Sequence, residues 1–304
     1  MQFHSPLTVP PIPTLTVKSG YKPQSIDTSI EVDVLMFQLL RQLTPQQKVQ
    51  RTCAFNRSVR KMAISGIKNQ YPNATEAKVR QEFIKRCLGA EWIKVLSDSR
   101  IRGEIVIADP IELAQKIASI LLSLNIPYVV GGSVASSLLG ENRSTQDLDL
   151  VIDLESRTAQ RLIDAMSGEF YISESAVNEA IAKSRISPRE SSFNVIYLPS
   201  MEKADIFVMS SDDPFSASVM SRRQLHVVSG LQEEGIYIYS PEDIVIQKLS
   251  WYKLIPGGSQ KQWRDVLGVL KVQGERLDRA YLNQWAVTLK LTDLLSGALL
   301  QSGY

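Results

Sequence analysis

The 304-residue sequence predicts an α+β fold, in which a mixed sheet flanked by helices follows an all-helical module and precedes a helical C-terminal region. Three observations lead to this prediction. Short β-type apolar runs alternate with helical stretches between residues 105 and 239, which is typical of a sheet covered by helices. Residues 30–100 instead repeat their apolar side chains near helical spacing. Residues 240–304 open on a helix cap and keep a helical pattern.

The same patterns divide the chain into four parts. Residues 1–29 are rich in proline, serine and threonine and are expected to form an extended tail. Residues 30–100 form a basic helical module, residues 105–239 the sheet core, and residues 240–304 a C-terminal helical subdomain.

Composition excludes several classes of protein. With 44% hydrophobic and 22% charged residues, the chain is neither wholly disordered nor collagen-like. It contains no run of about 18 apolar residues that would span a membrane, and its first residues do not resemble a signal peptide. Two cysteines and two histidines are too few for a disulfide framework or a zinc cluster. We therefore expect a cytoplasmic protein without membrane contact.

The net charge of +2 is unevenly distributed along the chain. Residues 41–102 contain fourteen Lys and Arg against four Asp and Glu, whereas the rest of the chain contains 20 basic and 28 acidic residues. Such an asymmetry favours an anionic partner, such as RNA, near the basic part. A set of solvated helix faces explains it equally well, and the sequence leaves both interpretations open.

The helical module is predicted from its caps and its spacing. Residues 32–43 form a dense apolar run, and Thr44 followed by Pro45 is typical of a helix N-cap with proline at the first helical position. Thr75 should cap a third helix. Residues 92–96 add a short helical piece. Together they predict a small helical unit.

The predicted sheet core and C-terminal region follow in order. The expected strands are 128–130, 148–154, 193–198, 204–209, 225–228 and 236–239, and the expected helices are 110–124, 133–140 and one capped by Ser156. Ser240-Pro241-Glu242-Asp243 then combines a cap, a first-turn proline and acids that face the positive end of the helix dipole. Helices are also expected at 260–272 and 276–289.

A possible phosphate cradle lies at Gly131-Gly132-Ser133, where a strand turns into a helix. Glycines let the backbone approach a phosphate, and a helix N-terminus offers N–H groups and a positive dipole end. Alone, however, such a run is more often a tight turn with an N-cap.

Three aspartates on predicted strands strengthen this interpretation. Asp147 and Asp149 alternate within an apolar strand, so that both carboxylates lie on one face, about 7 Å apart. Asp205 interrupts a second apolar run in the same way. Carboxylates on apolar strands are costly unless a cation pairs with them. The set predicts a Mg²⁺ (or Mn²⁺) site held by the three aspartates, although acids without a role on edge strands remain the alternative.

These residues, namely Gly131-Gly132-Ser133, Asp147, Asp149 and Asp205, together resemble the minimal nucleotidyltransferase superfamily with its polymerase-β-like fold. That family carries Gly-Gly-Ser or Gly-Ser, then two acids on the next strand and a third acid on a later strand. Residues 143–145, Arg-Ser-Thr, and the long gap before the first aspartate are closer to the AbiEii-type toxin branch than to the antibiotic adenylyltransferases. The resemblance covers residues 105–300 and implies a nucleotidyltransferase-type sheet.

The resemblance implies roles for further residues. AbiEii-like proteins carry a helix-borne lysine and then a basic residue followed by aspartate on the next helix, which correspond here to Lys248 and Arg264-Asp265. Lys248 would contact the nucleotide phosphates, Asp265 would complete the active site, and Arg264 would add charge. Arg143 and Thr145 are assigned to nucleotide binding with the glycine turn. Without the resemblance, Lys248 would count as a surface lysine and Arg264-Asp265 as a solvated pair.

The implied activity is transfer of a nucleoside monophosphate from an NTP to an acceptor hydroxyl. Asp147 and Asp149 would hold the metal ion, Asp205 would hold a second ion or act as base, and the glycine turn with Ser133 would bind the phosphates. RNA, including a tRNA end, is the expected acceptor through the basic module, and a protein or a small molecule is chemically equivalent.

Two other interpretations stay open. In the first, residues 30–100 act as a fused inhibitory or antitoxin-like partner of a toxin-like catalytic domain. In the second, the chain binds a nucleotide without transferring it, although a pure binder has no need of three metal ligands. The sequence does not set the oligomeric state, the NTP or the acceptor.

Overall fold

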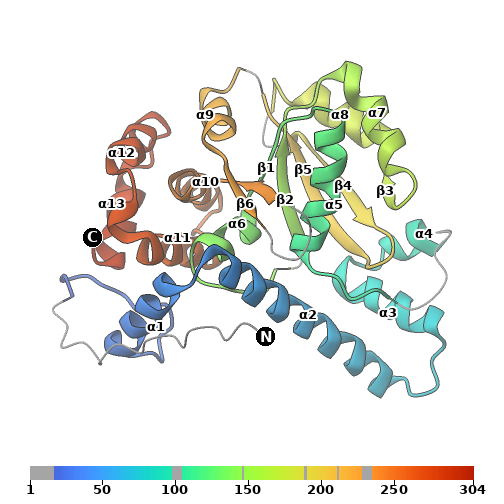
Figure 1. Cartoon of the computed structure of the whole chain (residues 1–304), viewed down its shortest axis with the longest axis horizontal. Coiled ribbons are helices and arrows are strands. Elements are labelled where there is room, and N and C mark those ends of the chain that lie inside the picture. The colour runs from blue at the N-terminus through green and yellow to red at the C-terminus, as the bar shows by residue number, and fades with distance from the viewer. Residues whose placement is uncertain (1–16, 98–104, 146, 188–189, 211, 228–234) are drawn as a thin grey trace. The chain divides into compact units, whose positions relative to one another are not determined.

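The computed structural model describes residues 17–97, 105–145, 147–187, 190–210, 212–227 and 235–304 (Figure 1). Residues 1–16 of the predicted tail therefore lie outside the described residues. The chain divides into two compact units. The first, called here the terminal unit, takes in residues up to Lys48 together with Ala135–Asn142 and Tyr239–Tyr304, and the second, the sheet unit, holds Val49–Val134 and Arg143–Ile238. The four-part division drawn from the sequence stays a prediction.

A seven-stranded mixed sheet forms the centre of the sheet unit, with the strand order β3-β4-β5-β2-β1-β7-β6. Its strands are β1 (Tyr128–Val130), β2 (Asp147–Ile152), β3 (Phe170–Ile172), β4 (Ser192–Tyr197), β5 (Glu202–Val208), β6 (Gln224–Val227) and β7 (Gly235–Ile238). β2 runs parallel to β5 and β1 runs parallel to β7, whereas the other neighbouring pairs are antiparallel. The predicted α+β class with a mixed sheet is confirmed.

Alternation along the two central strands explains where their charged residues lie. On β2, Leu148 and Leu150 are fully buried, whereas Asp147 and Asp149, which alternate with them, are partly exposed. On β5, Ala204 and Ile206 are fully buried in the same way. Because successive side chains of a strand point to opposite faces, Asp147 and Asp149 of β2 and Lys203 and Asp205 of β5 share the second face, whereas Glu202 lies on the buried face.

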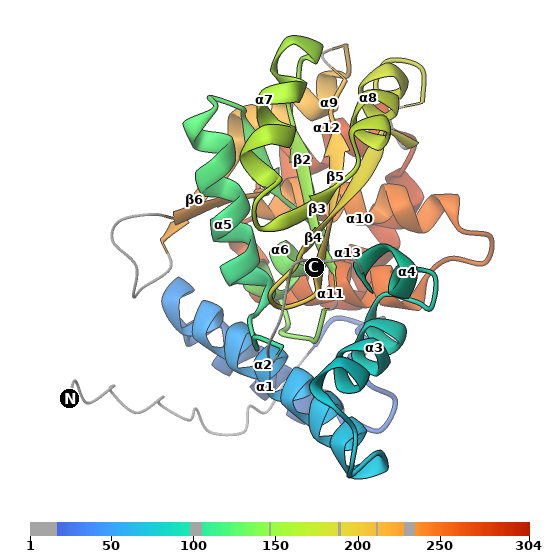
Figure 2. The ribbon, with the colours of Figure 1, turned by 90° about the vertical axis from the view of Figure 1, so that its right-hand side faces the viewer.

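Three helices form a layer against the sheet. α5 (Pro110–Ser123), α7 (Ser156–Met166) and α8 (Glu174–Lys183) contact its strands and contact one another in the order α5, α7, α8 (Figure 2). α5 starts where the sequence predicts, because Asp109 accepts hydrogen bonds from the backbone N–H groups of Ile111 and Glu112. Its buried apolar side then packs on the central strands.

The predicted helical module, residues 30–100, contains α1 (Ile30–Gln42), α2 (Pro45–Gln70), α3 (Glu76–Cys87) and α4 (Trp92–Ser97). α1 belongs to the terminal unit, and the name helical module is kept below for α2, α3 and α4. Thr44 and Gln47 cap the start of α2 reciprocally, and Thr75 caps α3, as predicted. Within the sheet unit, Phe83 and Ile67 are fully buried in one apolar cluster with Ile196 and Met201, which belong to the β4–β5 hairpin. The module is therefore packed on the sheet.

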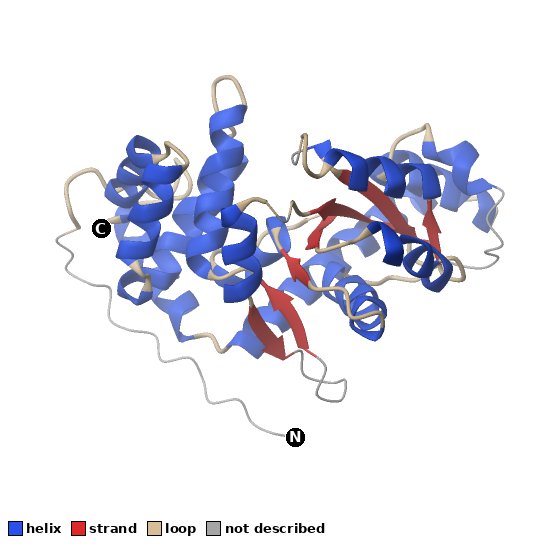
Figure 3. Cartoon of the chain, turned by 90° about the horizontal axis from the view of Figure 1, so that it is seen from above, coloured by secondary structure: helices blue, strands red, loops and turns tan. Residues whose placement is uncertain are grey.

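The terminal unit is helical among its described residues. It contains α1 (Ile30–Gln42), α10 (Pro241–Leu254), α11 (Gln260–Gln273), α12 (Arg279–Thr288) and α13 (Thr292–Ser302), coloured blue as helices in Figure 3. Ser240 caps α10 by accepting from the backbone N–H of Asp243 at 3.1 Å, as predicted. Phe37 and Leu40 of α1 pack on Val272 of α11. α6 (Gly132–Leu139) crosses the division between the units.

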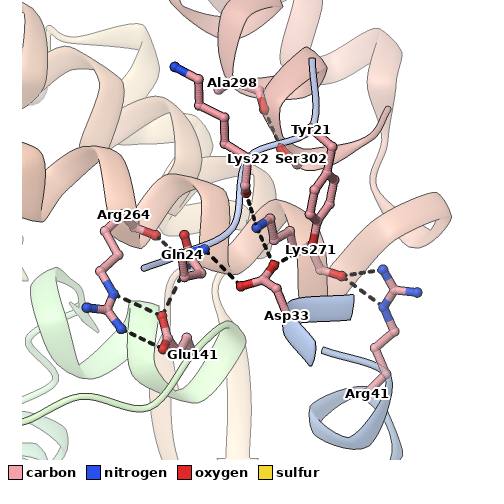
Figure 4. A network of polar contacts seen from close by, with 10 residues as sticks. All are labelled: Tyr21, Lys22, Gln24, Asp33, Arg41, Glu141, Arg264, Lys271, Ala298 and Ser302. Atoms are coloured by element: carbon pink, nitrogen blue, oxygen red, sulfur yellow. Dashed lines mark hydrogen bonds and ion pairs between the residues drawn. The ribbon is translucent and has the colours of Figure 1, made fainter. Parts of the chain in front are cut away.

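A buried ion pair fixes the N-terminal segment within the terminal unit (Figure 4). Lys271 of α11 donates to Asp33 of α1 at 2.7 Å and to the carbonyl of Lys22 at 2.6 Å. The Tyr21 hydroxyl and the backbone N–H of Gln24 also donate to Asp33. Asp33 and Lys271 are at most 1% exposed, and three residues donate to the Asp33 carboxylate at once. Burial and Asp33 raise the pKa of Tyr21.

Several elements differ from the prediction. β3, α8, α9 (Pro214–Arg222) and α13 were not expected. Ser156 is the first residue of α7 and not its cap, because the residue in the N-cap position is Glu155, which makes no side-chain capping bond. The helix expected from 276 begins at Arg279, since a short 3-10 turn precedes it. None of the described helices has the length and apolar character needed to cross a membrane.

Candidate functional site

Register between β2 and β5 brings the predicted aspartates onto neighbouring positions of the sheet unit. Asp149 stands directly opposite Asp205, and Asp147 stands opposite Lys203. All four side chains occupy the second, partly exposed face of the two strands. The predicted shared face of Asp147 and Asp149 is thus observed, and the third aspartate lies on the adjoining strand.

Lys203 is an unexpected member of this face. Its ammonium lies 3.1 Å from an Asp205 oxygen and 3.5 Å from an Asp147 oxygen. The Lys203 and Asp205 side chains are 22% and 23% exposed, whereas Asp147 is 45% exposed. Burial lowers the pKa of Lys203, but the two carboxylates outweigh this effect, so that the pKa is raised. Lys203 therefore stays a cation between two carboxylates.

The pKa of Asp205 is raised above its ordinary value. Burial raises the pKa of Asp205, the nearby Lys203 ammonium opposes that rise, and the charge of Asp147 adds to it. A carboxyl group with a raised pKa accepts a proton more readily than an ordinary aspartate.

The glycine turn after β1 is in direct contact with Asp149. The backbone N–H of Gly131 donates to the Asp149 carbonyl at 2.9 Å. Gly132 has φ +56°, and a Cβ atom at Gly132 would lie 1.7 Å from a carboxylate oxygen of Asp149. The carboxylate therefore occupies the space that a side chain would need. The structure thus brings the predicted phosphate cradle and the predicted metal ligands together.

Residues 143–145 also reach this turn. A guanidinium nitrogen of Arg143 donates to the Ser133 hydroxyl at 2.5 Å. The Thr145 hydroxyl donates to the carbonyl of Asp147 at 2.9 Å, and the Thr145 N–H donates to the side chain of Asn56 at 3.0 Å. Asn56 belongs to α2, so the helical module holds the segment that enters β2.

Lys248 and Asp265 form a second polar pair, in the terminal unit. α10 and α11 bring the Lys248 ammonium 2.8 Å from an Asp265 oxygen, and the two side chains are only 6% and 4% exposed. Lys248 is therefore no surface lysine. Arg264 instead pairs with Glu141 at 2.7 Å, which raises the pKa of its guanidinium, and its carbonyl accepts from the Gln24 side chain. The expected roles of Lys248, Asp265 and Arg264 in nucleotide binding stay predictions.

The metal ligands stay a prediction as well. In the described ranges, no group of three or more His, Cys, Asp and Glu side chains is arranged to hold a metal ion. Asp147 and Asp205 meet at the ammonium of Lys203, and Asp149 lies against Gly132. Two carboxylates that already surround one positive charge have the oxygen donors and the negative charge that a hard divalent cation requires. The residues therefore fit such an ion in chemical character.

Some basic residues of the helical module have partners within the sheet unit. Arg57 pairs with Asp109 at 2.8 Å and with Glu112 at 2.7 Å. Arg60 lies 3.7 Å from Glu202, donates to the carbonyl of Ser200 and covers the Phe83 ring. Other basic side chains of α2 and α3 are exposed, namely Arg51, Lys61, Lys68, Lys78, Lys85 and Arg86. Only part of the predicted basic surface is therefore open to solvent.

Sequence reasoning missed Lys203 and Asn56. The sequence does indicate the face on which Lys203 lies, because the two-residue alternation in Glu-Lys-Ala-Asp places it on the face of Asp205. Its contact with Asp147 depends on the parallel register, which the sequence does not state. Asn56 carried no signal, because its contact with Thr145 joins residues 89 positions apart.

Comparisons with known proteins give one family match. Residues 41–124 match the family model described as Rv0078B-related antitoxin, a stretch that runs from the end of α1 through α5. Because the match spans well under half of the chain, it describes this stretch alone. No curated protein matches the chain.

Several solved structures show some similarity to the chain. An antigenic nucleotidyltransferase-like protein from Paracoccidioides brasiliensis is 18% identical, with a TM-score of 0.40 over 63% of this chain and 93% of its own. The antibiotic-resistance factor ANT(2'')-Ia is 14% identical, with a TM-score of 0.39 over 63% and 94%. JHP933 from Helicobacter pylori is 15% identical, with a TM-score of 0.31 over 63% and 89%. Since these TM-scores lie below 0.5, the function is proposed from the residues of this chain.

Proposed function

We propose that the chain is a nucleotidyltransferase that depends on Mg²⁺ or Mn²⁺ and moves a nucleoside monophosphate from an NTP to an acceptor hydroxyl. One observation carries the proposal. Asp149 stands in register with Asp205 while its carboxylate packs on Gly132, so that a glycine turn and two strand-borne acids share one surface. A turn that accepts phosphate beside acids that accept a cation is the arrangement that a metal–nucleotide complex requires.

The metal ion would be held by Asp147, Asp149 and Asp205. Support comes from Lys203, whose ammonium already lies between two of these carboxylates as a stand-in positive charge. When bound, the ion supplies neutralisation of the negative charge on the transferring phosphate. The remaining chemistry belongs to the residues of the chain.

Phosphate binding would fall to Gly132, Ser133 and Arg143. The N–H of Gly131 is already donated to Asp149, so Gly131 shapes the turn, whereas the residues after it open α6 at the positive end of its dipole. Arg143 lies at the Ser133 hydroxyl and brings a planar cation suited to phosphate oxygens. Thr145 holds the strand that carries the acids through its bond to Asp147.

The transfer step follows from this arrangement. The acceptor oxygen forms a bond to the α-phosphorus, the bond from that phosphorus to the bridging oxygen breaks, and pyrophosphate leaves. Asp205 would orient the acceptor hydroxyl, whose proton passes to solvent water as the new bond forms. Positioning and charge neutralisation supply the rate acceleration.

The test is a transfer assay with matched variants. Wild type, Asp147→Asn and Asp153→Asn are incubated with Mg²⁺, each α-³²P-labelled NTP in turn and total RNA. Asp153 is an exposed acid just beyond β2 and serves as control. We expect label in wild type and Asp153→Asn, and a loss of at least about 100-fold in Asp147→Asn. Full activity in Asp147→Asn would refute the assignment.

RNA is the acceptor that the charge distribution supports. Six basic side chains of α2 and α3 are exposed, and Lys and Arg surfaces bind phosphate backbones. The same gel identifies the acceptor, since label runs either with RNA or with protein. Transfer to RNA should weaken steeply as the salt concentration rises, because such binding depends on counterion release.

A second candidate function is supported by the antitoxin-related match. In this interpretation the helical module restrains a toxin-like catalytic unit of the same chain. The match covers residues 41–124, and Asn56, inside it, bonds the backbone of Thr145 directly before the acids of β2. A module that holds this segment is in a position to control the site.

Asn56→Ala tests this restraint and leaves the rest of α2 in place. If the module restrains the site, the variant should transfer several-fold more label than wild type. Ser58→Ala, an exposed change on the same helix, is the control. Equal or lower activity in Asn56→Ala would instead assign Asn56 to positioning of the segment, and the restraint would be rejected.

A further inference from the structure

We propose that Lys203 is the resident counterion of the acidic face, the surface of β2 and β5 that carries Asp147, Asp149 and Asp205. Its ammonium holds Asp147 and Asp205 together while no divalent cation is bound. When a divalent cation binds, the ammonium moves away from both carboxylates. The proposal rests on the proposed function, because it concerns the same metal site. It assigns to Lys203 a positioning role that sets the metal affinity.

The placement of Lys203 is built into the sheet. It lies opposite Asp147 in the β2–β5 register and two residues before Asp205, so strand geometry puts all three on one face. Its ammonium reaches both carboxylates, at 3.1 and 3.5 Å. The Lys203 side chain is only 22% exposed, which distinguishes it from a solvated surface lysine.

Two carboxylates on neighbouring strands need a positive charge. Asp147 and Asp205 repel one another when both are ionised, and Asp205 is largely buried. The ammonium offsets this repulsion in the absence of any other cation. It also keeps the oxygens facing a common point, which preserves the arrangement of the site.

The ammonium and a divalent cation exclude one another at these oxygens. Both are cations that would share the same ligands, and like charges at such distances repel strongly. Lysine has a flexible four-carbon stem, so the ammonium can move away from the strands without a change in the backbone. Each ion therefore weakens the binding of the other by the same factor.

The experiment measures binding of Mn²⁺ alone, without nucleotide, to the full chain by the electron paramagnetic resonance signal of free Mn²⁺. Wild type is compared with Lys203→Met, Lys203→Gln, Asp147→Asn and Lys183→Met. Lys183→Met removes an equal charge from an i,i+4 pair on α8 and controls for net charge. Lys203→Gln keeps a polar side chain, so poor folding of the methionine variant does not decide the result.

We expect both neutral Lys203 variants to bind Mn²⁺ about tenfold more tightly than wild type, Lys183→Met to match wild type, and Asp147→Asn to lose binding. When a chelator removes divalent cations, Lys203→Met should unfold at a lower temperature than wild type. Addition of Mn²⁺ should raise the unfolding temperature of Lys203→Met by more than it raises that of wild type.

Three results would overturn the proposal. Equal Mn²⁺ affinity in wild type and both Lys203 variants, with binding lost in Asp147→Asn, would remove the counterion role and leave the proposed metal site intact. An equal gain in Lys183→Met would reduce the effect to net charge. Absence of Mn²⁺ binding in every variant would overturn the counterion role and the metal site of the proposed function together.

Discussion

At the scale of single residues, Glu202 is a buried acid outside the aspartate face. It is 2% exposed, accepts a hydrogen bond from Ser200 at 3.0 Å and lies 3.7 Å from Arg60, a loose ion pair. Burial raises its pKa from 4.5 to about 7, although Arg60 and Ser200 oppose the rise. Its carboxyl group therefore takes up a proton in the folded state at a pH where the unfolded chain has lost it.

This shift predicts a pH-dependent stability. Between pH 4.5 and 7 the folded state binds more protons at Glu202 than the unfolded state does. The contribution of Glu202 to the free energy of unfolding is therefore fully present below pH 4.5 and is lost as the pH rises through 7. The loss amounts to at most about 3 kcal/mol. Urea unfolding at pH 5 and at pH 7.5 measures this effect. Between these two pH values the free energy of unfolding should decrease less in Glu202→Gln than in wild type. Glu174→Gln, an exposed acid, should follow wild type, and an unchanged slope in Glu202→Gln would contradict the assignment.

Single residues also show how far the sequence defines the site. Alternation places Asp147 and Asp149 on one face, and Gly131-Gly132 indicates a turn, because both signals are local. The contact of Gly132 with Asp149 and that of Lys203 with Asp147 depend on which strands pair and in what register. Such pairings join distant segments, and a single sequence does not state them.

At the scale of elements, α1 and α11 are joined by the buried pair of Asp33 and Lys271. Burial lowers the pKa of Lys271, and Asp33 opposes that change. Lys271 also holds the backbone of Lys22, and its own carbonyl accepts from Arg41 at 2.8 Å. One residue thus connects α11 to both the N-terminal segment and α1.

Removing Lys271 should be costly for this reason. Lys271→Met leaves the Asp33 carboxylate buried without its ammonium, and we expect a loss of about 3–5 kcal/mol in the free energy of unfolding. Asp33→Asn combined with Lys271→Met removes both charges and should recover part of this loss. Urea unfolding of the single and double variants measures the coupling. If the double variant is as unstable as the sum of the two singles, the pair carries no interaction of its own.

Helices and strands could be predicted where the sequence around them carries a cap or a periodic pattern. α3 and α10 begin at caps that the sequence displays, Thr75 and Ser240, and both are confirmed. β3 has three residues, Phe170–Ile172, and exists through pairing with β4, so no periodicity revealed it. α13 has no capping side chain at its start, so the sequence does not mark where this helix begins.

At the scale of the whole molecule, the terminal unit is assembled from three stretches that lie far apart in the sequence. Its contacts connect early and late residues: the Lys22 N–H donates to the carbonyl of Gln301 at 3.0 Å, and Arg41 donates to the hydroxyl of Tyr304 at 2.9 Å. Composition and periodicity describe neighbours along the chain, so they could not indicate this assembly.

The terminal unit combines residues from both ends of the chain, so it can be completed only late in synthesis at the ribosome. Every residue of the sheet unit has been made once Ile238 is added, whereas Lys22 meets its partner only when Gln301 emerges. About 250 residues lie between Lys48 and Gln301, and at typical elongation rates their synthesis takes roughly 10–50 s. For most of that interval Phe37 and Leu40 lack Val272, and a chain released before position 272 would leave them permanently uncovered.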